Sequence, residues 1–120
     1  MNLEQDMREA YEKLKKQDPQ FPYRRCRFAV CEMYERGYPI VAGVISLDNY
    51  CNIGIKKIMG HWWNYDPETG NFFDITAGQF NHDLNTPLVT DSDKFKVWKP
   101  EDNQSIYTEK TRGLRPDQVL

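Results

Sequence analysis

The sequence lacks a long apolar run, and it lacks an excess of charge of either sign. No stretch resembles a membrane span, and the first six residues are too polar and acidic for a signal peptide. The 16 basic residues are spread along the chain among 18 acidic ones, whereas a protein that binds nucleic acid usually carries a basic patch. We therefore expect a cytoplasmic protein that binds neither a membrane nor nucleic acid.

Cysteine and histidine are scarce. The three cysteines, Cys26, Cys31 and Cys51, are odd in number and include no CxxC spacing. They therefore predict neither a disulfide framework nor a paired metal-ligand motif. In a reducing cytoplasm this pattern fits one reactive thiol and buried, inert ones.

A metal site is an alternative use of these residue types. The side chains of His61, Asp74, His82 and Asp83, together with a cysteine, suit zinc, but no close pair of ligands has the spacing of a zinc motif. We interpret His82 as a loop residue, and we expect no metal and no cofactor.

The chain is long enough for one hydrophobic core but not for two. We therefore expect a single domain over residues 1–120. Aromatic residues make up 13% of the sequence, a high share for this length, so the core should be aromatic.

Two segments have the periodicity of helices. From about Asn2 to Lys16 apolar residues recur on one stripe, which is typical of a surface helix. A second helix is predicted from Arg24 or Arg25 to about Arg36, and it is apolar on most sides, so we interpret it as the central, buried helix. Cys26 then lies in its first turn, where the free amides and the helix dipole favour a thiolate.

The later segments favour strands. Ile40–Leu47 is rich in β-branched residues, with Gly43 expected at a bulge or a close contact. Residues 54–60 are expected at the edge of the sheet, residues 77–80 in a short helical turn, and residues 95–98 in a last strand, whereas residues 105–112 could be helical. The predicted fold class is α+β, with helices packed on a small antiparallel sheet.

The segment from His61 to Thr76 predicts a β-hairpin. Aromatic and β-branched residues dominate both arms, and Pro67 and Gly70 suit the first and last positions of a four-residue loop. In that register His61 and Asp74 share one face as diagonal neighbours. Pairing shifted by one residue would place them on opposite faces, and an exposed histidine beside an incidental aspartate is the simpler alternative.

A cysteine at a helix start, a histidine on a strand and a carboxylate on the next strand resemble the papain-like fold in its broad sense. That group includes papain-type proteases, transglutaminase-like domains and bacterial NlpC-type amidases. Closer still is the resemblance to the small bacterial proteins called YunG-like, through Cys26-Arg27-Phe28-Ala29-Val30, His61-Trp62-Trp63-Asn64, Asp74-Ile75-Thr76 and Gln79-Phe80. It covers residues 24–80 and implies a papain-like core.

The resemblance implies a triad of Cys26, His61 and Asp74 in a thiol hydrolase or acyltransferase of the peptidase or amidase type, acting on a peptide or protein. The family pattern has glutamine where Arg25 stands. Gln20 precedes Cys26 by the spacing of the oxyanion glutamine in papain-type enzymes, and is a weak candidate for that role.

Trp62 and Trp63 would wall the substrate cleft, although aromatic residues on strands more often belong to the core. The main alternative function is a non-catalytic module on the same fold that binds a peptide or protein through its aromatic face, for example a phage or host-defence accessory protein. Such a module would keep its shape and affinity after loss of Cys26.

Overall fold

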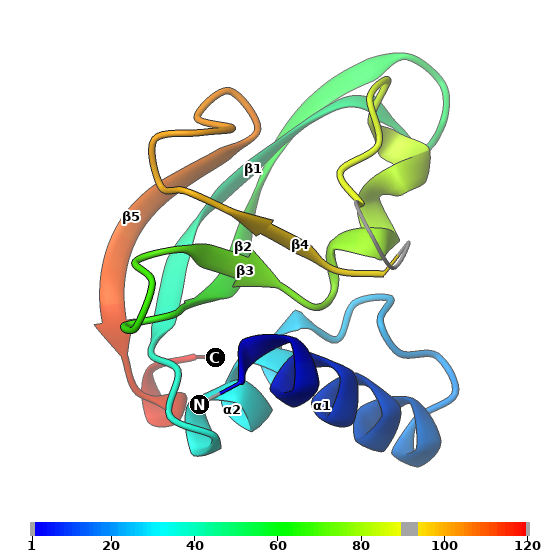
Figure 1. Cartoon of the computed structure of the whole chain (residues 1–120). Coiled ribbons are helices and arrows are strands. Elements are labelled where there is room, and N and C mark those ends of the chain that lie inside the picture. Colours follow the sequence, from blue (N-terminus) through cyan, green and yellow to red (C-terminus); the bar gives the residue numbers. More distant parts are fainter. Residues whose placement is uncertain (1, 90–93, 120) are drawn as a thin grey trace.

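The computed structural model describes residues 2–89 and 94–119, which form an α+β domain (Figure 1). Two α-helices, α1 (Leu3–Gln17) and α2 (Cys26–Glu35), lie side by side against an antiparallel sheet. No helix in the described part of the chain is long and apolar enough to cross a membrane.

The sheet has five described strands in the order β4-β3-β2-β1-β5. Their bounds are Ile40–Tyr50 (β1), Ile55–Tyr65 (β2), Phe72–Asp74 (β3), Lys96–Trp98 (β4) and Tyr107–Leu114 (β5). Two 3-10 helices, η1 (Ala77–Asp83) and η2 (Pro116–Gln118), follow β3 and β5. Each pair of neighbouring strands is antiparallel, as predicted.

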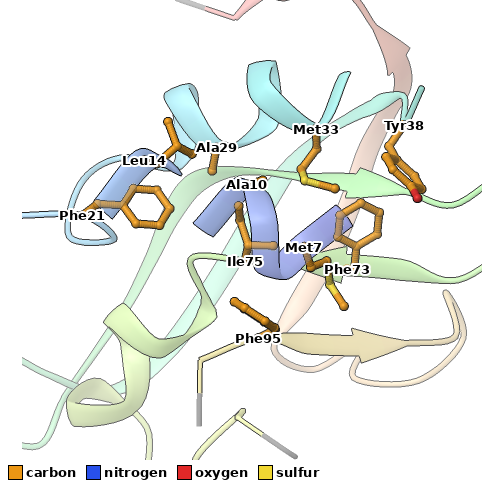
Figure 2. Close-up of a cluster of buried hydrophobic side chains, with 10 residues drawn as sticks. All are labelled: Met7, Ala10, Leu14, Phe21, Ala29, Met33, Tyr38, Phe73, Ile75 and Phe95. Carbon is orange, nitrogen blue, oxygen red and sulfur yellow. The ribbon is translucent and has the colours of Figure 1, made fainter. Parts of the chain in front are cut away.

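The first helix forms where its apolar stripe predicts it. Asn2 caps it by accepting a hydrogen bond from the backbone N–H of Gln5 (3.1 Å), and it ends just before Asp18-Pro19. Its buried face packs on α2, β3 and the segment before β4 in the cluster shown in Figure 2, made of Met7, Ala10, Leu14, Phe21, Ala29, Met33, Tyr38, Phe73, Ile75 and Phe95.

The two faces of the sheet bury different side chains. Cross-strand partners share a face, so Ile40, Asn64 and Phe73 lie together on the helix side, where Asn64 Nδ2 donates to the carbonyl of Val30 (3.2 Å). The opposite face carries the aromatic cluster of Trp63, Phe72, Trp98 and Tyr107 with aliphatic residues of β1. The expectation of an aromatic core is therefore confirmed.

The hairpin between β2 and β3 has the register favoured by its loop. Asn64 pairs with Phe73 and Tyr65 with Phe72, and the N–H of Asp66 donates to the carbonyl of Asn71 (2.8 Å). The predicted register is confirmed.

One predicted helix is wrong. Residues 105–112 were expected to be helical, but the structure places Tyr107–Leu114 in β5. The segment pairs along β1 from Ile45↔Tyr107 to Ile40↔Leu114, so the ladder of a neighbouring strand outweighs a weak local preference for helix. Strand β1 also extends further than expected, to Tyr50, and β2 begins at Ile55, within the segment that was expected in the sheet.

Gly43 allows β5 to close on β1. The register of the β1–β5 pair shifts between Ala42 and Gly43, and a Cβ at Gly43 would lie 2.2 Å from the carbonyl oxygen of Thr108 and 2.5 Å from Cη2 of Trp63. Both expected features of Gly43, a bulge and a close contact, are therefore confirmed.

We predict that Gly43→Ala destabilises the protein by about 2 kcal/mol or more, because the backbone of β5 cannot move away without breaking its ladder. Gly60→Ala is the matched control, since a Cβ there meets nothing within 4 Å, and its effect should stay within about 0.5 kcal/mol. Urea unfolding midpoints measure both. Equal midpoints for the two variants would contradict this account of Gly43.

Candidate active site

Cys26 is the first residue of α2 and is half-buried. The cap residue, Arg25, makes no side-chain hydrogen bond to the helix start. The first backbone amides of α2 therefore have no side-chain cap, and they lie beside the thiol at the positive end of the helix dipole.

His61 lies on β2 and is only 4% exposed. Its Nε2 is 2.8 Å from Oδ2 of Asp74, and the side chain of Cys26 lies close enough for the thiol to help raise the pKa of His61. Because Asp74 occupies Nε2, Nδ1 is the ring nitrogen left to exchange a proton with a thiol. The pairing of β2 with β3 ends at Asn64 and Phe73, so the two side chains meet where the strands separate.

Asp74 ends β3 and is 3% exposed. Its Oδ2 accepts from His61 Nε2 and from the hydroxyl of Tyr107 (2.7 Å). Its Oδ1 accepts from the backbone N–H (2.8 Å) and the hydroxyl (2.7 Å) of Thr76. A buried carboxylate with four donors is held in one orientation and in its ionised form.

The pKa values of the pair move apart. Burial alone would lower the pKa of His61, but the charge and hydrogen bond of Asp74, with a smaller contribution from Cys26, raise it from 6.5 to about 10. Burial alone would raise the pKa of Asp74, yet His61, Thr76 and Tyr107 hold it below its ordinary value. The arrangement therefore favours an imidazolium next to the thiol.

The three residues proposed as a triad thus come together from the start of α2, the middle of β2 and the end of β3. Such a group can take a proton from a thiol and hold it on an oriented imidazole.

Gln20 is less well placed. Its Oε1 accepts from Nη2 of Arg25 (3.0 Å), so its amide is tied to the residue before Cys26. A second amide lies nearby: Oε1 of Gln79 accepts from the backbone N–H of Arg24 (3.0 Å), while its Nε2 is buried and has no hydrogen-bond partner in the part of the chain that the structure describes.

Trp63 does not wall a cleft, so the sequence prediction is wrong for this residue, whereas it stays a prediction for Trp62. Trp63 is 1% exposed and lies within the aromatic cluster, because its position on β2 faces inward with His61. Trp62 alternates to the other face and packs partly buried on Val30, Ile40 and Val119.

The other cysteines differ from each other. Cys31 is half-buried in α2, and burial raises the pKa of its thiol. Cys51 is exposed in the β1–β2 turn, so the expectation that every other thiol is buried is wrong for it.

Within residues 2–89 and 94–119, no group of three or more His, Cys, Asp or Glu side chains could hold a metal ion.

Tyr107 is the functional residue that the sequence analysis missed. It is fully buried on β5, and its pKa is raised well above the ordinary value by burial and then by the charge of Asp74. The run Ile106-Tyr107-Thr108, with its aromatic and β-branched residues, is a strand signal, but nothing in it indicates a contact with Asp74.

We predict that Tyr107→Phe lowers the free energy of unfolding by about 1–3 kcal/mol, because it removes a buried hydrogen bond to a charged group. Tyr34→Phe, which removes the same atom from an exposed ring on α2, is the control. Urea unfolding of both variants measures the difference. An unchanged stability for Tyr107→Phe would show that this hydroxyl does not hold Asp74.

The raised pKa of His61 predicts a pH dependence of stability. Because the pKa rises from 6.5 to about 10 on folding, protonated His61 stabilises the folded chain fully below pH 6.5, and this contribution is lost as the pH rises to about 10. The gap in unfolding free energy between the native chain and His61→Gln should therefore narrow by about 1 kcal/mol or more across this range.

Urea unfolding at several pH values measures the gap, and His82→Gln is the control for removing an exposed imidazole. A gap that stays constant from pH 6.5 to 10 would mean that His61 is neutral in the folded protein.

Comparison of the chain with protein-family models, with curated proteins and with solved structures returns no match. The resemblance to papain-like and YunG-like proteins therefore stays a prediction, and a functional assignment depends on the geometry of Cys26, His61 and Asp74.

Proposed function

We propose that the protein is a thiol hydrolase or acyltransferase of the peptidase or amidase type, with Cys26 as nucleophile, His61 as general base and acid, and Asp74 as the group that orients His61. One observation carries the proposal. A buried imidazole is hydrogen-bonded to a carboxylate through one nitrogen, and the helix-start thiol of Cys26 is close enough to help raise its pKa. The relation to the papain-like fold and to bacterial YunG-like proteins is part of the same proposal.

In the proposed resting state the proton of the Cys26 thiol is already on Nδ1 of His61. Asp74 stabilises the imidazolium that results, and the amides at the start of α2 stabilise the thiolate. In a reducing cytoplasm, the setting we propose, the thiol stays available because all three cysteines are free.

The thiolate then attacks the carbonyl carbon of a peptide or amide substrate, and the carbonyl oxygen takes up the negative charge. The uncapped amides of α2, with the Gln20 amide as a weak candidate, would stabilise that oxyanion. His61 gives its proton to the leaving amine, the C–N bond breaks and a thioester forms on Cys26. Water or an amine, deprotonated by His61, then attacks the thioester and releases the thiol.

A binding module on the same fold is the second candidate. The aromatic face that it was expected to use is buried, so its interface would lie elsewhere. Ile53, Ile55 and Ile58, which are 67%, 53% and 68% exposed at the tip of the β1–β2 hairpin, favour this alternative. A binding module does not need a reactive thiol, so Cys26 reactivity separates the two functions.

The test is the pH dependence of iodoacetamide labelling of each cysteine. Chymotrypsin cleavage after Tyr23, Phe28 and Tyr50 places the three cysteines on separate peptides for mass spectrometry, whereas trypsin would cut on both sides of Cys26. We expect Cys26 to react at pH 6 about tenfold faster than the exposed Cys51, because His61 can act as the base for its thiol.

His61→Ala should slow the alkylation of Cys26 to the rate of an ordinary thiol and leave the alkylation rate of Cys51 unchanged. Asp74→Asn should shift the alkylation of Cys26 to higher pH. If Cys26 in the native chain reacts no faster than Cys51 at every pH, the hydrolase proposal fails and the binding module takes its place.

A further inference from the structure

A groove of about 650 Å³ adjoins the proposed catalytic residues. One wall is the segment before α2, with Gln20, Tyr23, Arg24 and Arg25, and the other wall is formed by η1 and the end of the β1–β2 hairpin. The groove reaches Arg25, the residue before Cys26. It also reaches Phe80, whose ring centroid lies 4.8 Å from that of His61. Cys26, His61 and Asp74 do not line the groove themselves, so a substrate bound here would contact the neighbours of these residues.

The two arginines of this groove differ in how they are paired. Arg25 is bound through Nε to the carboxylate of Asp18 and through Nη2 to Gln20, so its charge is largely balanced. Arg24 is exposed, and its guanidinium makes no side-chain hydrogen bond or ion pair with residues 2–89 or 94–119. Arg24 therefore has the positive charge available to a ligand in this part of the groove.

The backbone of Arg24 supports the same conclusion. Its φ is 57°, a left-handed conformation that is uncommon for a residue other than glycine and is concentrated at functional sites. The hydrogen bond from its N–H to Oε1 of Gln79 holds this conformation across 55 residues of sequence. Thus η1 positions the arginine beside Cys26.

Gln79 also provides an independent sign of a ligand. Gln79 lines the groove, and its Nε2 is buried and has no hydrogen-bond partner among the described residues. Buried donors without a partner are rare in native proteins, so an oxygen atom from a ligand or a water is expected beside it.

The two ends of the groove carry side chains of opposite charge. Asp83 at the far end of η1 lines the groove, and its Oδ1 accepts from the N–H of Cys51 (2.8 Å). Asp83 follows Gln79 by four positions of 3-10 helix, a rise of roughly 8 Å. The groove is therefore positive near Cys26 and negative at the hairpin.

We propose that this groove binds the acyl side of an acidic peptide, with a substrate carboxylate paired to the guanidinium of Arg24. The proposal rests on the catalytic function proposed above, and it adds the class of substrate. Because Arg24 precedes Cys26 by two residues, a bidentate pair between its guanidinium and a substrate carboxylate would orient the peptide toward the start of α2.

The test compares the rates at which Cys26 is alkylated by iodoacetate, which is anionic, and by iodoacetamide, which is neutral. The ratio of the two rates cancels the intrinsic reactivity of the thiol. Arg24→Gln should lower the ratio by about threefold or more at low salt. Arg24→Lys, which keeps the charge, and Arg27→Gln, which removes a charge next to Cys26 but outside the groove, should keep the native ratio.

A second measurement does not depend on the thiol. The native protein and Arg24→Gln are titrated with N-acetylglutamate methylamide and with its glutamine counterpart, and ¹H–¹⁵N spectra follow the amides of Arg24 and Gln79. We expect shifts with the acidic compound only, and their loss in Arg24→Gln. Equal shifts for both compounds, or an alkylation ratio that Arg24→Gln leaves unchanged, would overturn the proposal.

The two proposals fail in different ways. If Cys26 alkylates no faster than Cys51 but the acidic compound still shifts Arg24 and Gln79, the groove binds carboxylates and the catalytic function is wrong. If Cys26 is highly reactive and neither measurement depends on Arg24, the catalytic function stands and the acidic substrate is wrong.

Discussion

The site depends on the buried carboxylate of Asp74. Taking a charge out of water is costly unless donors replace the lost hydration, and here four donors do so, from His61, Tyr107 and Thr76. These residues lie on β2, on β5 and directly after β3. The same contacts that make the charge tolerable therefore tie the hairpin to the far strand of the sheet and fix the imidazole that faces Cys26.

Close approach of β5 is the structural condition for this arrangement. Gly43 leaves room for the backbone of Thr108 and the ring of Trp63, and the register shift beside it lets β5 follow β1. Trp63, Trp98 and Tyr107 then pack against one another, which excludes water around Asp74. Low access to water strengthens the electrostatic coupling between Asp74 and His61.

Much of this arrangement could be predicted because it is encoded locally. Pro67 and Gly70 set the hairpin loop, and alternation along the strands then places His61 near Asp74. Apolar periodicity placed Cys26 in the first turn of α2. The sequence analysis missed strand β5 because its backbone pairs with β1, more than 60 positions earlier in the chain. A local sequence pattern does not indicate such a distant partner.

The sequence by itself determined the α+β class, the hairpin register and the place of Cys26 at a helix start, since these follow from turn chemistry and from periods of 3.6 and 2 residues. Only the tertiary structure decided that the hydroxyl of Tyr107 donates to Asp74 and that Trp63 belongs to the core. It also decided that Arg25, and not Arg24, is paired with Asp18. The physical reason is that each of these depends on which distant group occupies the space beside a side chain, and that is set by packing of the whole chain.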